Sequence, residues 1–316
     1  MAKEKMKKKK GEKITPAILW KQRWLLVMSV PFVIWLIIFK YIPLWGWTMA
    51  FQEVKPATFA LPIWERTWVG FQNFTDAFKD RLFTQTLINT LGVSFLDIAV
   101  GTIAAIAFAV LLNEMFFMKF KKVTQTISYL PHFLSWIIVT GILHDALSGT
   151  GIINELLVNF GILDQPLNFF AYPKYFWPIV AFANVWKETG WNAIIYLSAI
   201  TAIDPSLYEA ANMDGAGRWA RIKYVTLPGI KPTIMILLLM NVGNVLNAGF
   251  EIQYLLGNGL VQSVSQTIDI YVLKWGISQN DFSIGTAAGI FKSLVSIILI
   301  VIANQIAKRN GEERLF

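Results

Sequence analysis

The sequence contains no cysteine and only two histidines, His132 and His144. Without cysteine, the chain has no disulfide framework, no thiolate metal site and no cysteine nucleophile. Two histidines are too few for a histidine-rich metal cluster. The Gly-x-x-x-x-Gly-Lys-Ser/Thr pattern of a nucleotide-binding P-loop is also missing. We therefore predict no metal site, no catalytic residue, no bound cofactor and no ATP-hydrolysing site in this chain.

Charged residues are scarce and hydrophobic residues abundant. Only 15% of the 316 residues are charged, 55% are hydrophobic, and the mean hydropathy is +0.50. A soluble surface needs more charge than this, whereas a membrane span needs about 20 mostly apolar residues. Six stretches meet that requirement: 24–47, 87–112, 123–143, 176–203, 228–256 and 284–307. We predict an all-α membrane protein with six transmembrane helices in one bundle.

Basic residues are distributed unevenly along the chain. Nine of the 28 Lys and Arg residues precede Trp24, and 19 of the 28 fall in segments 1–23, 113–122, 204–231 and 308–316. The positive-inside rule then predicts a multi-pass protein with both termini in the cytoplasm. We expect a basic tail (1–23), a transmembrane domain (24–307) and a C-terminal tail (308–316).

The basic tail leads directly into the first hydrophobic stretch. This arrangement disfavours a nucleic-acid-binding role, and we predict no nucleic-acid partner. The apolar stretch is also too long for a cleaved signal peptide, and no small-residue cleavage site follows it. We interpret it as a retained anchor.

Polar residues inside spans tend to face a cavity or the bundle interior. In the fifth stretch, Asn241, Asn244 and Asn247 recur every three residues and Glu251 follows four later, which predicts a polar stripe on one helix face. Such side chains suit either sugar hydroxyls or hydrogen bonds between helices. The fourth stretch has a mixed aromatic and polar middle. The candidate substrate-pathway residues are Asn244, Asn247, Glu251, Tyr254, Trp186, Lys187, Trp191 and Asn192.

Five charged or ionisable residues in the spans have simpler interpretations. Asp97 and Lys292 are lone charges, for which we expect an ion pair between helices. His132, next to Pro131, is expected to make a packing or loop contact. Lys187 and Glu188 are neighbours, so they point in different directions, and we expect at least one of them to face water or another helix.

Segment 204–228 holds the most specific pattern in the sequence. Asp204 is a good helix N-cap, Pro205 fits the first helical position, and Asp214-Gly215 is a turn signal that ends the first helix. A second short helix is expected over 217–225, ending at Leu227-Pro228. Small residues around the turn suit insertion into another protein's cleft. An ordinary connecting loop is the alternative.

Glu209-Ala-Ala, Asp214-Gly-Ala and Leu227-Pro228 resemble the EAA signature of bacterial ABC importer permeases. The segments Phe39-Lys-Tyr-Ile-Pro43, Trp186-Lys-Glu-Thr-Gly-Trp191 and Gly311-Glu-Glu-Arg-Leu-Phe316 resemble the LplB-like branch of sugar permeases, which is related to the maltose-system permease. The resemblance implies a type I importer permease fold in a bacterial cell membrane. It also implies that loop 204–228 is the coupling helix, seated on the ATPase through Tyr208, Glu209, Ala210, Ala211, Asp214, Gly215, Ala216 and Gly217.

The same resemblance implies how such a permease works and with which partners. These are a second permease, two ATPase copies that bind ATP and Mg²⁺, and an extracytoplasmic solute-binding protein. Transport by alternating access then moves sugars, most specifically oligosaccharides derived from polysaccharide. The alternatives are an ion-coupled secondary transporter, a membrane-bound glycosyl- or lipid-transferase, and an ABC permease for a non-sugar solute.

Overall fold

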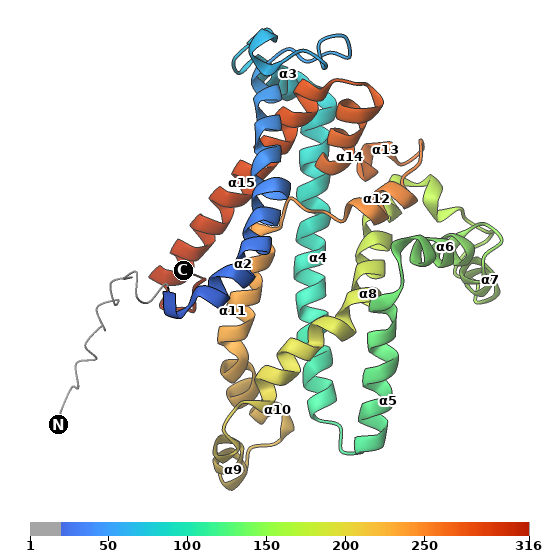
Figure 1. The fold of residues 1–316 in the computed structure, drawn as a ribbon. Helices are drawn as coiled ribbons and strands as arrows, with labels where there is room; N and C mark the ends of the chain where they lie inside the picture. The colour runs from blue at the N-terminus through green and yellow to red at the C-terminus, as the bar shows by residue number, and fades with distance from the viewer. Residues whose placement is uncertain (1–19, 316) are drawn as a thin grey trace. The chain divides into compact units, whose positions relative to one another are not determined.

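The computed structural model describes residues 20–315, which are almost entirely helical and contain no named strand (Figure 1). The predicted basic tail lies outside the described residues up to position 19. The chain divides into two compact units: the first ends at Thr48, and the second begins at Met49. Helix α2 (Arg23–Leu36) continues through a π turn (Ile37–Tyr41) and a 3-10 helix (Ile42–Phe51), which ends just inside the second unit. A window of 18 residues in this stretch has a mean hydropathy of 2.3, as a membrane span requires.

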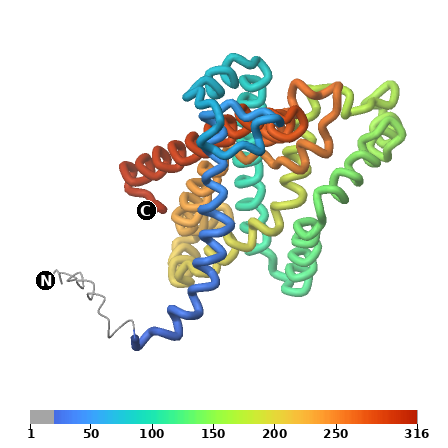
Figure 2. The backbone as a smooth tube through the Cα atoms, turned by 45° about the horizontal axis from the view of Figure 1, so that its top comes forward, coloured from blue at the N-terminus to red at the C-terminus, as the bar shows by residue number. Residues whose placement is uncertain are grey.

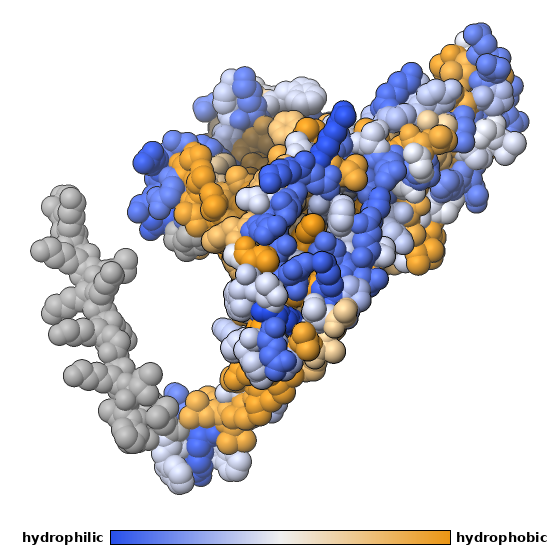
Figure 3. All heavy atoms as spheres, turned by 90° about the horizontal axis from the view of Figure 1, so that it is seen from above, coloured by the Kyte–Doolittle hydropathy of each residue, from blue (hydrophilic) through white to orange (hydrophobic). Residues whose placement is uncertain are grey.

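The second unit contains the remaining helices. In chain order they are α3 (Gln72–Lys79), α4 (Arg81–Asn113), α5 (Met118–Tyr129), α6 (Trp136–Leu147), α7 (Ile152–Asn159), α8 (Pro173–Thr201), α9 (Pro205–Met213), α10 (Arg218–Arg221), α11 (Leu227–Gly243), α12 (Phe250–Leu256), α13 (Gln262–Ser265), α14 (Ile268–Leu273) and α15 (Phe282–Arg309). Seen from the α3 and α14 end, hydrophilic residues cover much of the visible face (Figure 3).

The predicted all-α membrane protein is confirmed. Five helical stretches within residues 20–315 are long and apolar enough to cross a membrane: Arg23–Phe51, Arg81–Asn113, Trp136–Asn159, Arg218–Gly243 and Phe282–Arg309. Helix α8, which covers the predicted fourth span, is not among them by hydropathy. Its 29 residues nevertheless extend about 43 Å at 1.5 Å per residue, enough to cross a bilayer. Its polar residues are the reason for its lower hydropathy.

The prediction of one continuous third span, 123–143, is wrong. Helix α5 ends at Tyr129, a 3-10 turn follows at Leu130–Phe133, and α6 begins at Trp136. Pro131 has no backbone N–H to donate and its ring obstructs an α-helix, so the chain turns here. The tube view in Figure 2 shows the change of direction between the two green helices.

The fifth span is also broken, which corrects the predicted polar stripe. Helix α11 ends at Gly243 and α12 starts only at Phe250, so Asn244 and Asn247 lie in a non-helical crossing rather than on a helix face (Figure 1). Asn244 Nδ2 donates to the carbonyl of Met240 at 3.1 Å, which satisfies a last-turn acceptor of α11. Gly249 has φ +71°, which a glycine adopts without strain.

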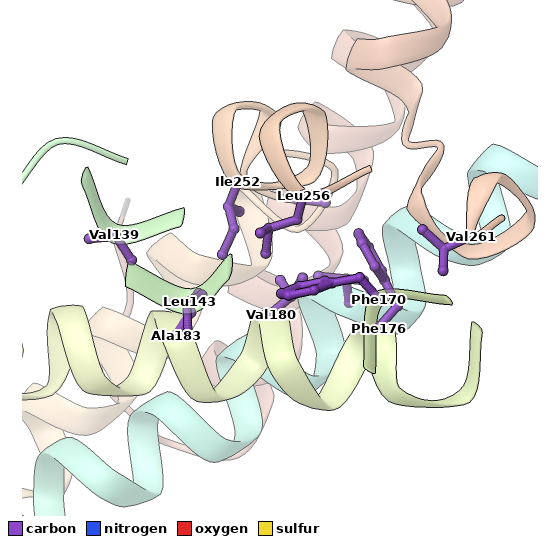
Figure 4. Packing of buried hydrophobic residues seen from close by; sticks show 11 residues of the cluster. Val139, Leu143, Phe170, Phe176, Val180, Ala183, Ile252, Leu256 and Val261 are labelled. Carbon is purple, nitrogen blue, oxygen red and sulfur yellow. The ribbon is translucent and has the colours of Figure 1, made fainter. Parts of the chain in front are cut away.

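Helices α6, α8 and α12 enclose the principal hydrophobic cluster. Figure 4 shows Ile252 and Leu256 of α12 directed toward Leu143 of α6 and Val180 of α8. Helices α5 and α8 approach so closely that a Cβ at Gly190 would lie 2.0 Å from the carbonyl oxygen of Ser128. Gly190 is therefore required by backbone contact, and α8 is held against both halves of the broken third span.

Candidate functional site

The predicted coupling loop, residues 204–228, forms two helices at one end of the second unit (Figure 1). The Asp204 side chain accepts a hydrogen bond from the Ser206 N–H at 2.9 Å, which caps α9 as predicted. That bond to the charged carboxylate holds the pKa of Asp204 below its ordinary value. The cap is consequently complete at neutral pH and is lost as the pH falls through the lowered pKa.

A left-handed glycine ends α9. Gly215 has φ +75°, and the N–H groups of Ala216 and Gly215 donate to the carbonyls of Ala211 and Asn212 at 2.9 and 3.0 Å. This is the paired bonding of a Schellman motif, in which the residue after the helix takes the left-handed conformation. The predicted Asp214-Gly215 turn is confirmed, with its backbone polar groups satisfied inside the loop.

The second helix does not end at Leu227-Pro228, contrary to the prediction. Helix α10 leads through a π turn (Ile222–Thr226) into α11, so one helical rod joins the loop to a membrane span. Pro228 lies in the first turn of α11, where its missing N–H has least effect. Any displacement of the loop can therefore reach α11 through continuous helical backbone.

Two side-chain hydrogen bonds connect α9 to this rod. Tyr208 Oη lies 3.0 Å from Thr226 Oγ1, and Arg221 Nη1 donates to Asn212 Oδ1 at 2.8 Å. Around them the loop shows small or exposed groups: Glu209, Ala210, Asp214, Gly215 and Gly217 are exposed, and Ala211 and Ala216 are half-buried. Met213 and Trp219 are 88% and 83% exposed, so the loop presents two large apolar side chains on its surface.

A polar cavity of about 240 Å³ lies between α4, α8 and α11. The polar residues that line it are Asp97, Thr102, Asn184, Glu188, Thr189, Asn192, Tyr196 and Asn241. Asn184 Nδ2 donates to Asp97 Oδ2 at 2.9 Å. Asp97 Oδ1 and Thr189 Oγ1 are buried and have no hydrogen-bond partner within residues 20–315. Because such atoms are costly to bury alone, they mark positions for groups supplied from outside the chain.

An ion-pair cluster supports one wall of this cavity. Lys187 is 6% exposed, and its Nζ donates to the carbonyl of His132 at 2.7 Å and to Glu188 Oε1 at 3.1 Å. His132 Nδ1 lies 2.7 Å from Glu188 Oε2, and the His132 ring stacks on Trp191 with centroids 4.4 Å apart. The cluster ties the turn between α5 and α6 to α8. The expected packing role of His132 is confirmed, and so is the expectation that Lys187 or Glu188 contacts another element. The prediction that these two neighbours point apart is wrong, because both long side chains bend toward His132 and their charged ends meet at 3.1 Å.

The expected ion pair between helices is found for one of the two lone charges, Lys292, and not for the other, Asp97. Lys292 of α15 pairs with Asp269 of α14, as an ion pair between helices predicts. Asp97 instead accepts from an amide, Asn184, so the ion-pair prediction is wrong for Asp97. The difference follows from position, because Asp97 faces the cavity between α4 and α8.

Of the predicted substrate-pathway residues, Asn192 lines the polar cavity. Lys187 does not line this cavity and pairs with Glu188, and Trp191 stacks on His132. Trp186 lines a separate apolar cavity against α6 and α7. Asn244 and Asn247 are exposed and bonded to each other at 3.1 Å, and Glu251 is exposed at the start of α12. Tyr254 borders a second polar cavity near α13 and α14. The predicted residues therefore lie in several distinct places, and their role in a substrate pathway stays a prediction.

Asn184 and Glu188 were not among the predicted pathway residues, although the sequence contains a signal for them. Asn184, Glu188 and Asn192 are spaced by four, which places them on one face of α8. Facing them on α4, Asp97, Gly101 and Ala105 have the same spacing. Two facing rows of this kind indicate a polar seam between two helices.

The fold and these two regions define a multi-pass membrane permease with a protruding helical loop. The chain belongs to the family of binding-protein-dependent transport system inner membrane components, whose family model matches residues 97–311. It is 42% identical to the polygalacturonan/rhamnogalacturonan transport system permease protein YteP of Bacillus subtilis, over 98% of this chain and 95% of the relative. It is 41% identical to protein LplB of the same organism, over 95% and 93% of the two chains.

Crystal structures of bacterial alginate ABC transporters contain chains of the same fold. One, from an importer of the acidic polysaccharide alginate, has a TM-score of 0.84 and 36% identity and covers 93% of this chain and 98% of its own. Another, in complex with a periplasmic protein bound to an alginate pentasaccharide, has a TM-score of 0.86, 35% identity and coverage of 95% and 99%. These similarities confirm the type I importer permease fold. The chain is an ABC permease and not an enzyme, since ATP is hydrolysed by separate ATPase subunits.

Proposed function

We propose that this chain is one permease of a heterodimeric ABC importer that carries oligosaccharide fragments of polysaccharide into a bacterial cell. The carrying observation is the self-bonded loop 204–228, continuous with span α11 and exposing Met213 and Trp219. A rigid protrusion on the end of a span is what an ATPase needs in order to move that span. The proposed cargo follows from the relatives, whose transport systems carry polygalacturonan, rhamnogalacturonan or alginate.

The orientation follows from the same loop. With loop 204–228 in the cytoplasm, the basic segments and both termini lie on the cytoplasmic side, in agreement with the positive-inside rule. Two ATPase copies, with ATP and Mg²⁺, then dock on this chain and on a second permease. An extracytoplasmic solute-binding protein docks on the opposite side, as a periplasmic protein does on the related alginate transporter.

The polar cavity is the proposed wall of the translocation pathway. Its 240 Å³ is below the roughly 300–1,000 Å³ of complete small-molecule sites, which supports a pathway completed by the second permease. Carboxamides and carboxylates such as Asn192, Asn241 and Glu188 can accept from or donate to sugar hydroxyls. The exposed pair Asn244–Asn247 in the broken span suits contact with the second permease or the cargo.

Cross-linking tests the coupling loop directly, because the native chain has no cysteine. One cysteine is introduced as Ala211→Cys and another in the surface groove of the ATPase encoded with this permease. We expect a cross-link whose yield changes when ATP is added. Thr58→Cys, in an exposed segment remote in sequence from the loop, is the matched control and should give none. No cross-link from Ala211, Asn212 or Ala216 in folded complex would contradict the proposal and favour an ion-coupled transporter.

A further inference from the structure

A second polar cavity, of about 320 Å³, lies at the opposite end of the second unit from α9 (Figure 1). It is formed by α12, the loop after it, α13, α14 and the π turn Lys274–Ser278. The side chains that define its chemistry are Gln253, Tyr254, Asn258, Gln262, Gln266 and Lys274. In the proposed orientation, this cavity opens on the side where cargo arrives.

Lys274 is the cation of this cavity, and within residues 20–315 it has neither an acidic partner nor a side-chain hydrogen bond. The carboxylate of Asp269, five residues earlier in the chain, is paired with Lys292 of α15. Lys274 itself is half-buried, so its ammonium group is partly removed from water. A cation held in a polar cavity without a carboxylate attracts an anionic group from outside.

Gln253 gives independent evidence for a ligand. This residue is 0% exposed and lines the cavity, and its Oε1 has no hydrogen-bond partner in the described part of the chain. Its Nε2 reaches the carbonyl of Ala248 only at 3.5 Å. A buried carboxamide oxygen without a donor is costly, and a ligand hydroxyl would satisfy it.

The walls of the cavity are rigid. Ile252 and Leu256, on the other face of α12, are buried in the hydrophobic cluster of Figure 4. The Gly257 N–H donates to the carbonyl of Gln253 at 3.0 Å, and a Cβ at Gly257 would lie 2.7 Å from that oxygen, so glycine is required where α12 ends. Asn258 fixes the loop after α12 by donating to the carbonyl of Phe170 at 3.1 Å. Groups positioned this firmly can bind a ligand with little loss of conformational entropy.

We propose that this cavity is an entrance subsite for an acidic sugar, in which Lys274 binds the carboxylate of a uronic acid residue. Gln253, Gln262, Gln266 and the Tyr254 hydroxyl meet the sugar hydroxyls. The subsite rests on the proposed import of oligosaccharides and specifies the charge of the cargo. The translocation cavity differs, because Asp97 and Glu188 line it and Lys187 is already engaged by Glu188. Acidic cargo is therefore recognised by charge at the entrance and is not retained by a cation of this chain farther in.

Protection of an introduced thiol measures binding at the subsite without relying on transport. Ser278→Cys places a reporter in the cavity wall of the complete importer, reconstituted in nanodiscs without the binding protein. Alkylation by a membrane-impermeant maleimide is followed with increasing trigalacturonate or with its neutral, carboxyl-reduced analogue. We expect trigalacturonate to protect the thiol at lower concentration than the neutral analogue does.

Lys274→Gln should raise the protecting concentration of trigalacturonate about tenfold, as expected for loss of one charge-assisted hydrogen bond at a half-buried site. Protection by the neutral analogue should not change, and Lys274→Arg should retain most of the preference. Lys174→Gln is the matched control: Lys174 lies over the ring of Tyr175 and does not line this cavity. Equal protection by both sugars in the native background, or equal effects of both glutamine variants, would overturn the subsite.

Two further measurements separate this inference from the proposed function. Protection by the binding protein alone, with no protection by free sugar, would identify the cavity as a protein-docking surface and overturn the subsite. ATP-dependent uptake of trigalacturonate by the native complex with its binding protein tests the proposed function itself. Uptake without charge-selective protection would refute only the subsite, whereas absence of uptake for both the acidic and the neutral sugar would refute oligosaccharide import and the subsite together.

Discussion

The loop 204–228 and the polar cavity between α4, α8 and α11 both contain many polar groups, but the chain supplies hydrogen-bond partners for them to different extents. In the loop, a Schellman motif and two side-chain bonds, Tyr208–Thr226 and Arg221–Asn212, occupy polar groups within the chain. In the cavity, Asp97 Oδ1 and Thr189 Oγ1 remain buried without partners among the described residues. The loop is therefore held in shape by its own hydrogen bonds, whereas the cavity keeps buried polar atoms without partners, as expected if a second permease completes the proposed pathway.

The largest effect is expected at the ion-pair cluster that supports the cavity. Lys187→Met leaves the Glu188 carboxylate without its ammonium partner and the His132 carbonyl without its donor. Because the Lys187 side chain is only 7% exposed, we expect a loss of about 3–5 kcal/mol in stability, seen as a lower midpoint of thermal unfolding for the assembled complex.

Controls distinguish this cluster from a general need for lysine. Lys174→Met, at a lysine outside the cluster, should change stability by no more than about 0.5 kcal/mol. The double variant Lys187→Met with Glu188→Gln should recover part of the loss, because it removes both charges of the pair. If the single variant is as stable as the native complex, the cavity wall does not depend on this ion pair.

A smaller effect is expected from the loop's turn. Gly215→Ala places a Cβ on a residue with φ +75°, which costs about 1–2 kcal/mol although no other atom lies within 4 Å of that Cβ. We expect a lower ratio of sugar imported to ATP hydrolysed, because the preformed loop is less populated. Gly217→Ala is the matched control, since Gly217 has φ −70° and equally open surroundings. Equal ratios for the two variants would show that the left-handed turn is not needed for coupling.

The sequence predicted the loop well because its signals are local. The Asp204 cap, Pro205 and the Asp214-Gly215 turn each act within a few residues, and all three occur in the structure. The breaks in the third and fifth spans were missed because hydropathy reports how apolar a stretch is and not whether its helix is continuous. The cavity was only partly predicted, since Asn184 and Asp97 meet across 87 residues of sequence. The apolar cavity that Trp186 lines was not predicted for the same reason, because the type of a residue does not determine which neighbouring helix its side chain faces.

The smallest of these effects concerns how the loop moves the span. Thr226 is 1% exposed and ends the π turn, and Tyr208 reaches it from α9, 18 residues away in sequence. The π turn and Pro232 both weaken the backbone hydrogen bonding of the rod, so bending is easiest here. The Tyr208–Thr226 bond bypasses the π turn and connects α9 directly to the start of α11.

Tyr208→Phe removes that bond with little change in side-chain volume. One hydrogen bond contributes about 1 kcal/mol, so we expect an approximately fivefold fall in sugar imported per ATP, with ATP hydrolysis and complex assembly retained. Tyr224→Phe, at a residue in the same turn that is 69% exposed, should leave the ratio unchanged. A Tyr208→Phe complex with full import per ATP would mean that the continuous backbone of α10 and α11 transmits the movement alone. A fall in both import and ATP hydrolysis would instead mean that Tyr208 contacts the ATPase. The internal hydrogen bonds of the loop would then serve to dock the ATPase and not to transmit its movement.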